Sequence, residues 1–305
     1  MEILYALEKI RFPALNQLML LLTRLGEETA FLVIALIVFW CVDKRKGYYV
    51  MAVGFLGTLG SQFLKLACRV PRPWVLDENF TIVEQAREAA SGYSFPSGHT
   101  QTAVGTFGSL AYTAKKRWMK ILFIALMTLV AFSRMYLGVH TPADVLVGAA
   151  LSLALVIGVQ PLIYGKGEKR MKILLGVMTA LALVYLLYIE LYPFPADMDA
   201  ANLTSGQKNV YTLLGCLIGV DLVYLADRRL NFPVEARWWV QIIKVLVGLV
   251  LVLAVKEGLR SPLEALLPVL PARAVRYFLV VITAGILWPL SFRKLAGLGN
   301  QKEKK

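Results

Sequence analysis

Long apolar runs, each closed by polar or basic residues, dominate the hydropathy pattern of this chain. Nine of these runs approach the ~20 residues that a helix needs to cross a membrane. They lie near 27–42, 48–67, 96–114, 119–137, 141–164, 172–192, 208–226, 238–255 and 274–292. Residues 1–26 are amphipathic and interrupted by Pro13, which indicates a segment along the membrane interface. The pattern predicts an all-α, polytopic membrane helical bundle with about nine transmembrane helices and an N-terminal interfacial helix.

Composition supports a membrane protein. The 305 residues are 58% hydrophobic, whereas an ordinary soluble domain has roughly 45–50% apolar residues. The net charge of +13 is explained by basic residues at the cytoplasmic ends of membrane helices. The sequence has no separate basic domain and no basic patch interleaved with aromatic residues, so we expect no nucleic-acid partner.

The distribution of basic residues predicts an orientation. Nineteen of the 33 lysine and arginine residues fall on one predicted side and thirteen on the other, with Lys244 inside a span. Because basic residues concentrate in cytoplasmic loops, we expect the N-terminus outside and the C-terminus in the cytoplasm. The expected location is the cytoplasmic (plasma) membrane, with a polar cytoplasmic tail at 293–305.

Three local patterns also predict structure. Thr141 followed by Pro142 is typical of a helix N-cap and first helical residue. Residues 81–90 suggest a short surface helix in the polar connection 68–97. Asp221 and Lys244 lie at similar depths within their spans, which predicts an ion pair between neighbouring helices.

Three polar clusters interrupt the apolar pattern between residues 65 and 144, and the predicted topology brings all of them to the outer face. Their chemistry suits a phosphate group. Lys65, Arg72 and Arg134 supply three cations, and arginine can bind two phosphate oxygens at once. Ser97 and Gly98 open a predicted helix, whose backbone N–H groups and dipole favour an anion.

The same clusters contain the only two histidines of the chain, His99 and His140. A neutral imidazole can attack phosphorus directly. Asp144, four residues after His140, can hold one ring nitrogen and leave the other free for attack. His99 can then protonate the leaving oxygen and later activate water. The carboxylates and histidines are too few for a typical zinc or two-metal site, so we expect neither a metal nor another cofactor.

The three clusters together resemble the signature of the type 2 phosphatidic acid phosphatase/haloperoxidase superfamily. Lys65 precedes Arg72-Pro73 by six intervening residues, Pro96-Ser97-Gly98-His99 follows, and Ser133-Arg134 precedes His140 and Asp144. The resemblance covers about 50–160. It implies that His140 forms a phosphohistidine supported by Asp144, and that His99 is the acid and base. It also implies phosphate binding by a wider set of residues: Lys65, Arg72, Ser97, Gly98, Ser133 and Arg134.

The resemblance to the membrane lipid-phosphatase branch implies metal-independent hydrolysis of a lipid phosphate or diphosphate at the outer face of the membrane. The additional C-terminal spans and the sequence of residues 69–73 are similar to those of sphingosine-1-phosphate phosphatases. Neither feature selects among isoprenyl diphosphate, phosphatidic acid, phosphatidylglycerol phosphate and sphingoid phosphate as substrate. Oligomeric state is also left open.

We expect four segments: an interfacial segment at 1–26, a catalytic core at 27–165, additional transmembrane helices at 166–292 and the tail at 293–305. Two alternative functions remain open at this level. The histidine could transfer its phosphoryl group to a lipid or sugar acceptor. Alternatively, the protein could be a catalytically silent lipid transporter or binding module, although every signature position is filled.

Overall fold

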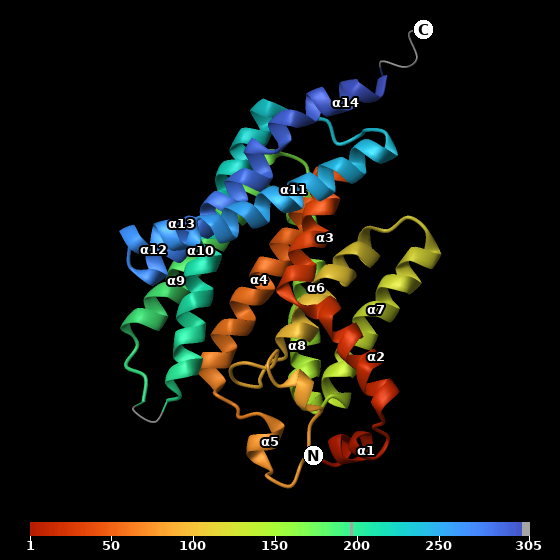
Figure 1. Ribbon diagram of the computed structural model, residues 1–305, viewed down its shortest axis with the longest axis vertical. Coiled ribbons are helices and arrows are strands. Elements are labelled where there is room, and N and C mark those ends of the chain that lie inside the picture. Colours follow the sequence, from red (N-terminus) through yellow and green to blue (C-terminus); the bar gives the residue numbers. More distant parts are fainter. Residues whose placement is uncertain (196–197, 301–305) are drawn as a thin grey trace. The chain divides into compact units, whose positions relative to one another are not determined.

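The computed structural model describes residues 1–195 and 198–300, and this part of the chain contains helices and loops without a β-strand (Figure 1). The predicted all-α class is therefore confirmed. The main helices are α1 Glu2–Lys9, α2 Pro13–Thr23, α3 Glu28–Cys41, α4 Lys44–Cys68, α5 Pro73–Leu76, α6 Gly98–Thr113, α7 Arg117–Tyr136, α8 Pro142–Tyr164, α9 Glu168–Leu191, α10 Ala200–Leu230, α11 Trp238–Gly258, α12 Arg260–Leu266, α13 Val269–Ile282 and α14 Phe292–Asn300. Short helical turns lie at Arg24–Gly26, Glu84–Ala86, Thr283–Leu287 and Pro289–Ser291.

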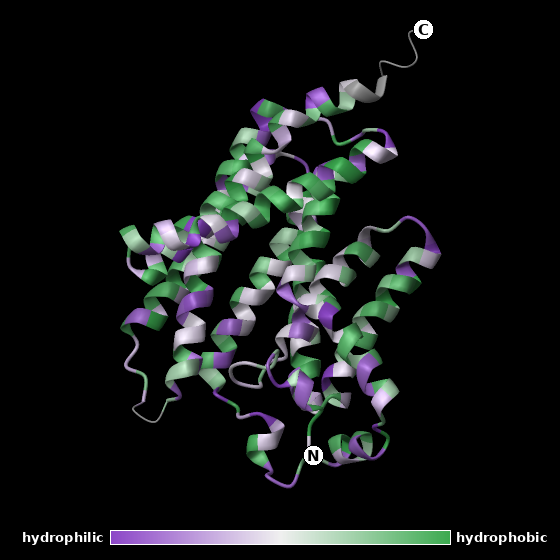
Figure 2. Cartoon of the chain, viewed as in Figure 1, coloured by the Kyte–Doolittle hydropathy of each residue, from purple (hydrophilic) through white to green (hydrophobic). Residues whose placement is uncertain are grey.

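Seven helical segments among the described residues are long and apolar enough to cross a membrane. Figure 2 shows the apolar residues along these helices and the hydrophilic residues gathered at many of their ends and loops. All nine predicted spans contain a helix, but α3 has 14 residues and α6 has 16. At ~1.5 Å per residue, the shorter of these extends ~21 Å against a hydrocarbon core of ~30 Å. The multi-pass membrane architecture is confirmed, whereas the count of nine is not.

The chain divides into two compact units. The first comprises Met1–Leu32, Tyr49–Pro161 and Pro193–Gly206. The second comprises Val33–Tyr48, Leu162–Tyr192 and the residues from Gln207 onward. Three helices, α3, α4 and α8, therefore begin in one unit and end in the other, as does α10.

Within the first unit, α6 is largely buried by the rest of the protein. This burial explains how a helix rich in threonine, serine and glycine lies in a membrane protein without exposing its polar side chains to lipid. The hydroxyl of Ser152 in α8 donates to the carbonyl of Gln101 in α6 over 2.7 Å. The hydroxyl of Tyr49 in α4 donates to the carbonyl of Val156 in α8. These buried bonds join the helices whose ends carry the polar clusters.

The N-terminal segment attaches to the loop that precedes α6. It is broken as predicted, because Pro13 is the first residue of α2. Arg11 donates to the carbonyl oxygens of Thr81 at 2.7 Å and Tyr136 at 2.8 Å. The predicted interfacial location of α1 and α2 stays a prediction.

The predicted surface helix at 81–90 is wrong. The structure has only a short 3₁₀ turn at Glu84–Ala86 within this stretch. The backbone around it bonds to other parts of the unit instead, since the N–H of Val83 donates to the carbonyl of Leu137 over 3.1 Å. Tertiary contacts therefore replace the local helical pattern.

Within the second unit, the predicted ion pair between Asp221 and Lys244 is also wrong. Asp221 accepts a hydrogen bond from the hydroxyl of Thr179 in α9 at 2.8 Å. Lys244 is fully buried and donates to the backbone carbonyls of Pro233 and Val234 at 3.2 and 2.9 Å. The loop before α11 folds back over Lys244 and satisfies it, so no carboxylate is required.

The C-terminal helix α14 contains the first part of the predicted tail 293–305. Residues 301–305 lie outside the described residues, and the cytoplasmic location of the tail stays a prediction.

Candidate active site

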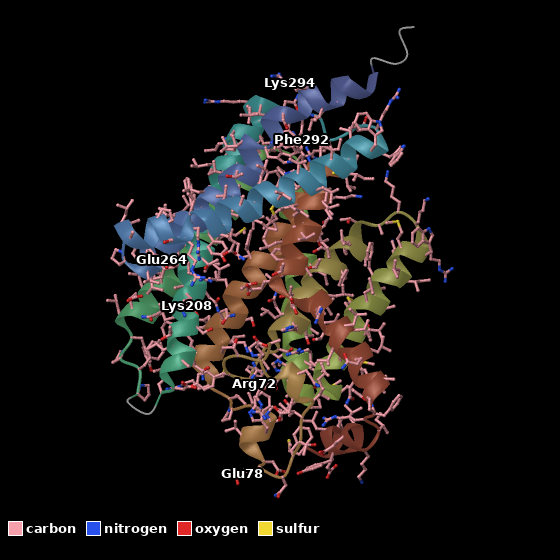
Figure 3. The ribbon with its side chains drawn as sticks, viewed as in Figure 1. Arg72, Glu78, Lys208, Glu264, Phe292 and Lys294 are labelled. Atoms are coloured by element: carbon pink, nitrogen blue, oxygen red, sulfur yellow. The ribbon has the colours of Figure 1, made fainter. Side chains whose placement is uncertain are left out.

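The predicted site residues lie at helix ends and in the connecting loops of the first unit. Lys65 lies in the last turn of α4, and Arg72 immediately precedes α5. Ser97 is the N-cap of α6, Arg134 lies in the last turn of α7, and His140 lies between α7 and α8. Figure 3 shows Arg72 among the helices of this unit, whereas Glu78 projects outward from the following loop.

The starts of α6 and α8 approach each other closely. A Cβ atom added to Gly148 would lie 2.7 Å from the carbonyl oxygen of Ser97, so no larger residue fits there without movement. The N–H of Ser97 donates to the carbonyl of Asp144 at 3.0 Å. The second and third polar clusters are thus joined through their backbones.

His140 is buried, with 1% of its surface exposed. The turn before it requires Gly138, whose φ of +82° lies in the left-handed region that favours glycine. Nη1 of Arg72 lies 2.9 Å from Nε2 of His140 and donates to the carbonyl of Val139 at 3.0 Å. Because arginine only donates, Nε2 of a neutral His140 accepts in this contact and the ring proton is on Nδ1.

Arg72 also holds the loop before α6. Its Nε donates to the carbonyl of Gly92 at 2.9 Å, and its Nη2 donates to the carbonyl of Ser91 at 2.7 Å. Arg72 therefore connects the imidazole of His140 to the backbone of the 91–92 loop. A phosphate oxygen that binds Nη1 would have to replace the contact with Nε2.

A reciprocal cap fixes the carboxylate of Asp144. The N–H of Thr141 donates to Oδ2 of Asp144 at 2.7 Å, and the N–H of Asp144 donates to Oγ1 of Thr141 at 3.3 Å. The helix begins at Pro142, so the predicted cap and first helical residue are confirmed. The same Oδ2 lies 3.5 Å from Nδ1 of His140. This arrangement is a capping box with an aspartate in place of the usual Glu or Gln.

Ser94 lies between the two residues of this pair and is fully buried. Its hydroxyl donates to Oδ2 of Asp144 at 2.6 Å and lies 3.4 Å from Nδ1 of His140. The donors from Ser94 and Thr141 hold this buried carboxylate in its orientation toward the imidazole.

Arg134 and His99 have buried polar atoms that the protein does not satisfy. Arg134 is fully buried, and its Nη1 donates to the hydroxyl of Thr23 at 2.7 Å. Its Nε and Nη2 have no hydrogen-bond partner among the described residues, and neither has Nε2 of His99. An arginine cannot lose its charge to escape this cost. The two arginine nitrogens are donors suited to an anion, and Nε2 of His99 is a third when it carries a proton.

Lys65 is also buried and close to the same loop. Its Nζ donates to the carbonyl of Tyr93 and lies 3.5 Å from the carbonyl of Ser94. An ammonium group has three donors, so one remains for a ligand.

The other predicted phosphate-binding residues have different surroundings. The hydroxyl of Ser97 accepts from the N–H and hydroxyl of Thr100, as a helix cap does. A Cβ added to Gly98 would meet no heavy atom within 4 Å, so space is open beside this backbone. The hydroxyl of Ser133 donates to the carbonyl of Val130 in its own helix at 2.7 Å.

The charges around the site affect His140 directly. Burial first, and then the cations Arg72, Arg134 and Lys65, lower the pKa of His140 well below 6.5. The imidazole is therefore neutral at neutral pH, as a nucleophile must be. The described residues contain no group of three or more His, Cys, Asp or Glu side chains placed to hold a metal ion. Metal-independent chemistry stays a prediction.

Sequence reasoning missed Ser94 and Thr23. Ser94 lies two residues before Pro96 and could have been found only as a polar neighbour of the second cluster. Thr23 ends the N-terminal amphipathic stretch, and nothing in that pattern connects it to Arg134.

Comparison with known families matches two parts of the chain. Residues 45–168 match the family described as the PAP2 superfamily. Residues 211–302 match the family described as PAP2 superfamily phosphatase, transmembrane extension. No solved structure matches significantly.

Several curated proteins are similar to this chain. A Dictyostelium discoideum protein named "Probable sphingosine-1-phosphate phosphatase" is 33% identical over 44% of this chain and 35% of its own length. Undecaprenyl-diphosphatase BcrC of Bacillus subtilis is 30% identical over 42% of this chain and 63% of its own length. Phosphatidylglycerophosphatase B of Bacillus subtilis is 30% identical over 48% of this chain and 74% of its own length. The match thus spans about a third of the first relative and just under two thirds of the second.

Proposed function

This chain belongs to the PAP2 superfamily, and from that membership we propose that it hydrolyses a lipid phosphate or diphosphate in a multi-pass membrane setting. The observation that carries the proposal is the set of unsatisfied buried nitrogens on Arg134 and His99, beside the neutral imidazole of His140. A phosphate anion would satisfy these donors and offset the cations around it. The names of the relatives support a lipid phosphate as the substrate class.

The reaction would proceed in two steps. Nε2 of His140 attacks the terminal phosphorus, a P–N bond forms, and the P–O bond to the leaving group breaks. The leaving group is the lipid alkoxide of a monophosphate or the lipid phosphate of a diphosphate. The leaving oxygen takes a proton from His99, which the negative charge of the bound phosphate helps to keep protonated beforehand. Water then loses a proton to His99 and attacks the phosphohistidine, releasing inorganic phosphate and restoring His140.

The cations have separate roles in this scheme. Arg134 binds two phosphate oxygens through Nε and Nη2, the two nitrogens that have no partner within the described protein. Nη1 of Arg72 transfers its hydrogen bond from Nε2 of His140 to a phosphate oxygen, which frees Nε2 for attack. Lys65 contributes its remaining donor, and Gly98 contributes a backbone N–H at the start of α6.

Asp144 and Ser94 would act by positioning His140. Asp144 accepts a hydrogen bond from the Nδ1–H of His140 and offsets the positive charge that the ring gains as it becomes a phosphohistidine. We propose that Ser94 is a positioning residue, because its hydroxyl holds the carboxylate at 2.6 Å beside Nδ1. Ser133 would bind phosphate only after its hydroxyl leaves the carbonyl of Val130.

We also propose the location of the reaction. The excess of basic residues on the opposite side supports a site at the outer face, with the N-terminus outside and the C-terminus in the cytoplasm. A lipid substrate would keep its tails in the bilayer and present its phosphate to this face of the cytoplasmic membrane. Residues 27–165 would form the catalytic core and 166–292 the additional transmembrane region.

The test is turnover by purified His140→Ala protein with a chelator present. The substrates to be assayed are isoprenyl diphosphate, phosphatidic acid, phosphatidylglycerol phosphate and sphingoid phosphate. We expect the unmutated protein to release phosphate from one or more of these and His140→Ala to release none. Arg87→Gln is the control, because Arg87 is an exposed cation of the same loop and pairs with Glu84.

Two outcomes would contradict this mechanism: turnover retained by His140→Ala, or strict dependence of the unmutated protein on added Mg²⁺. An added alcohol acceptor separates hydrolysis from transfer, since a phosphotransferase would form a new phosphate ester. Lipid movement between leaflets that survives His140→Ala would indicate a transporter.

A further inference from the structure

A second cationic site lies in the second unit and shares no residue with the site assigned to the reaction. We propose that Arg273 and Arg276 of α13 bind the phosphodiester of an anionic membrane phospholipid. The proposal concerns binding and does not depend on the proposed hydrolysis. Figure 3 labels Lys208 of α10, which contacts Arg273, and Glu264 of α12 in the same part of this unit.

Arg276 is the unusual residue of this region. It is 5% exposed, and its Nε has no hydrogen-bond partner among the described residues. A buried guanidinium N–H without an acceptor is costly, and the group cannot become neutral. An interfacial arginine usually avoids this cost by extending its side chain to the headgroups, but Nε of Arg276 stays buried. An anion bound beside Arg276 would supply the acceptor that Nε lacks.

The neighbouring acids are already paired with other cations. Glu257 pairs with Lys256 at 3.1 Å, and Glu264 pairs with Arg260 at 3.5 Å. Glu257 also interacts electrostatically with Arg276, but its side chain is 60% exposed and forms its ion pair with Lys256. Within the described residues, Arg276 thus has an acidic neighbour but no ion pair or hydrogen bond to it.

Arg273 places a second guanidinium on the same face of α13, because residues three apart on a helix are neighbours. Its Nε donates to the hydroxyl of Thr212 at 2.6 Å and the carbonyl of Lys208 at 3.1 Å in α10. The guanidinium carbons of Arg273 and Arg276 lie 5.3 and 5.4 Å from the ring centre of Tyr277. The N–H donors of two guanidinium groups thus lie near one tyrosine ring, and guanidinium donors are suited to phosphate oxygens.

The surface beside this pair is apolar, which favours a lipid over a soluble anion. Leu266 and Val269 are 80% and 57% exposed, and Val275, next to Arg276, is 37% exposed. Arg276 lies seven residues into α13, about 10 Å from its start. A phospholipid can bring a phosphate to this depth and cover the adjacent leucine and valine side chains with its acyl chains.

The experiment measures retained lipid by native mass spectrometry and melting temperature in detergent. The probes are dioleoyl phosphatidylglycerol, dioleoyl phosphatidylcholine and inorganic phosphate. We expect phosphatidylglycerol to bind and to raise the melting temperature, with at least about tenfold weaker binding to Arg276→Gln. Arg260→Gln is the matched control, since Arg260 is 63% exposed and paired with Glu264. It should bind phosphatidylglycerol as the unmutated protein does.

Two further variants keep the test decisive. Arg276→Met retains the volume and suits the apolar surroundings, so it should fold without lipid and lose the response to phosphatidylglycerol. Arg134→Gln should keep that response, which separates this site from the catalytic one. The proposal is overturned if Arg276→Gln and Arg276→Met bind phosphatidylglycerol normally, if phosphatidylcholine binds equally well, or if inorganic phosphate alone reproduces the stabilisation.

Discussion

Replacing Ser94 by alanine removes one hydroxyl and leaves every predicted phosphate-binding cation in place. The carboxylate of Asp144 would lose its donor at 2.6 Å and keep the N–H of Thr141 at 2.7 Å. A hydrogen bond to a charged group contributes about 1.5–3 kcal/mol, and 1.36 kcal/mol corresponds to a tenfold change in rate. If this energy serves to hold Asp144 toward His140, kcat should fall about 10- to 150-fold.

The assay is steady-state phosphate release by Ser94→Ala across substrate concentrations. KM should change little, because Lys65, Arg72 and Arg134 still bind the phosphate. Ser152→Ala is the matched control: its hydroxyl is equally buried and donates to the carbonyl of Gln101 at 2.7 Å, outside the site. It should lose a similar amount of stability without the fall in kcat.

Ser94→Thr retains the hydroxyl and should recover much of the lost kcat, although its extra methyl group will reduce stability in this buried position. Two results would refute a positioning role for Ser94. One is a kcat for Ser94→Ala within about twofold of Ser152→Ala, well below the tenfold minimum expected. The other is a loss that appears entirely in KM, which would assign the hydroxyl to substrate binding.

Three other predictions concern the same site. Gly98→Ala should fold normally, because an added Cβ meets no atom within 4 Å. If the phosphate approaches this backbone, the substitution should lower kcat/KM about tenfold or more. An unchanged kcat/KM would show that the phosphate does not approach Gly98. Asp144→Asn should reduce kcat by about 10²–10⁴-fold. The loss should be smaller than that of His140→Ala, because the imidazole loses its orientation but the nucleophile remains. Equal losses in the two variants would contradict these separate roles. Burial and neighbouring cations lower the pKa of His140 well below 6.5. The loss of kcat/KM that follows protonation of His140 should therefore have its midpoint below pH 6.5. An acidic midpoint at or above 6.5 would be inconsistent with this environment.

Local patterns in the sequence predicted much of the fold. The apolar runs predicted every long helix, because the requirement to satisfy backbone polar groups in lipid leaves few alternatives to a helix. The start of α8 was also predictable, since a threonine side chain can cap a helix N-terminus and proline suits the first helical position. The predicted count of nine spans was not confirmed, because α3 and α6 have 14 and 16 residues and a span needs ~20.

The predictions that failed concerned partners distant in the chain. Asp221 and Lys244 have opposite charges at similar depths, yet Thr179 binds the first and backbone carbonyls bind the second. The position of a residue within a span indicates its depth in the membrane. It does not indicate which way the side chain points around the helix axis, or where the nearby loops run. The same limitation applies to residues 81–90, whose backbone bonds to a distant turn.

The sequence by itself determined that this is a multi-pass helical membrane protein with a set of histidines and cations suited to phosphate chemistry. These properties follow from residue type, spacing and hydropathy, which are local. Only the tertiary structure decided that Ser94 binds Asp144 across 50 positions and that Thr23 binds Arg134 across 111. Those contacts depend on where loops and helix ends meet, and the energies that bring them together are distributed over the whole packed unit.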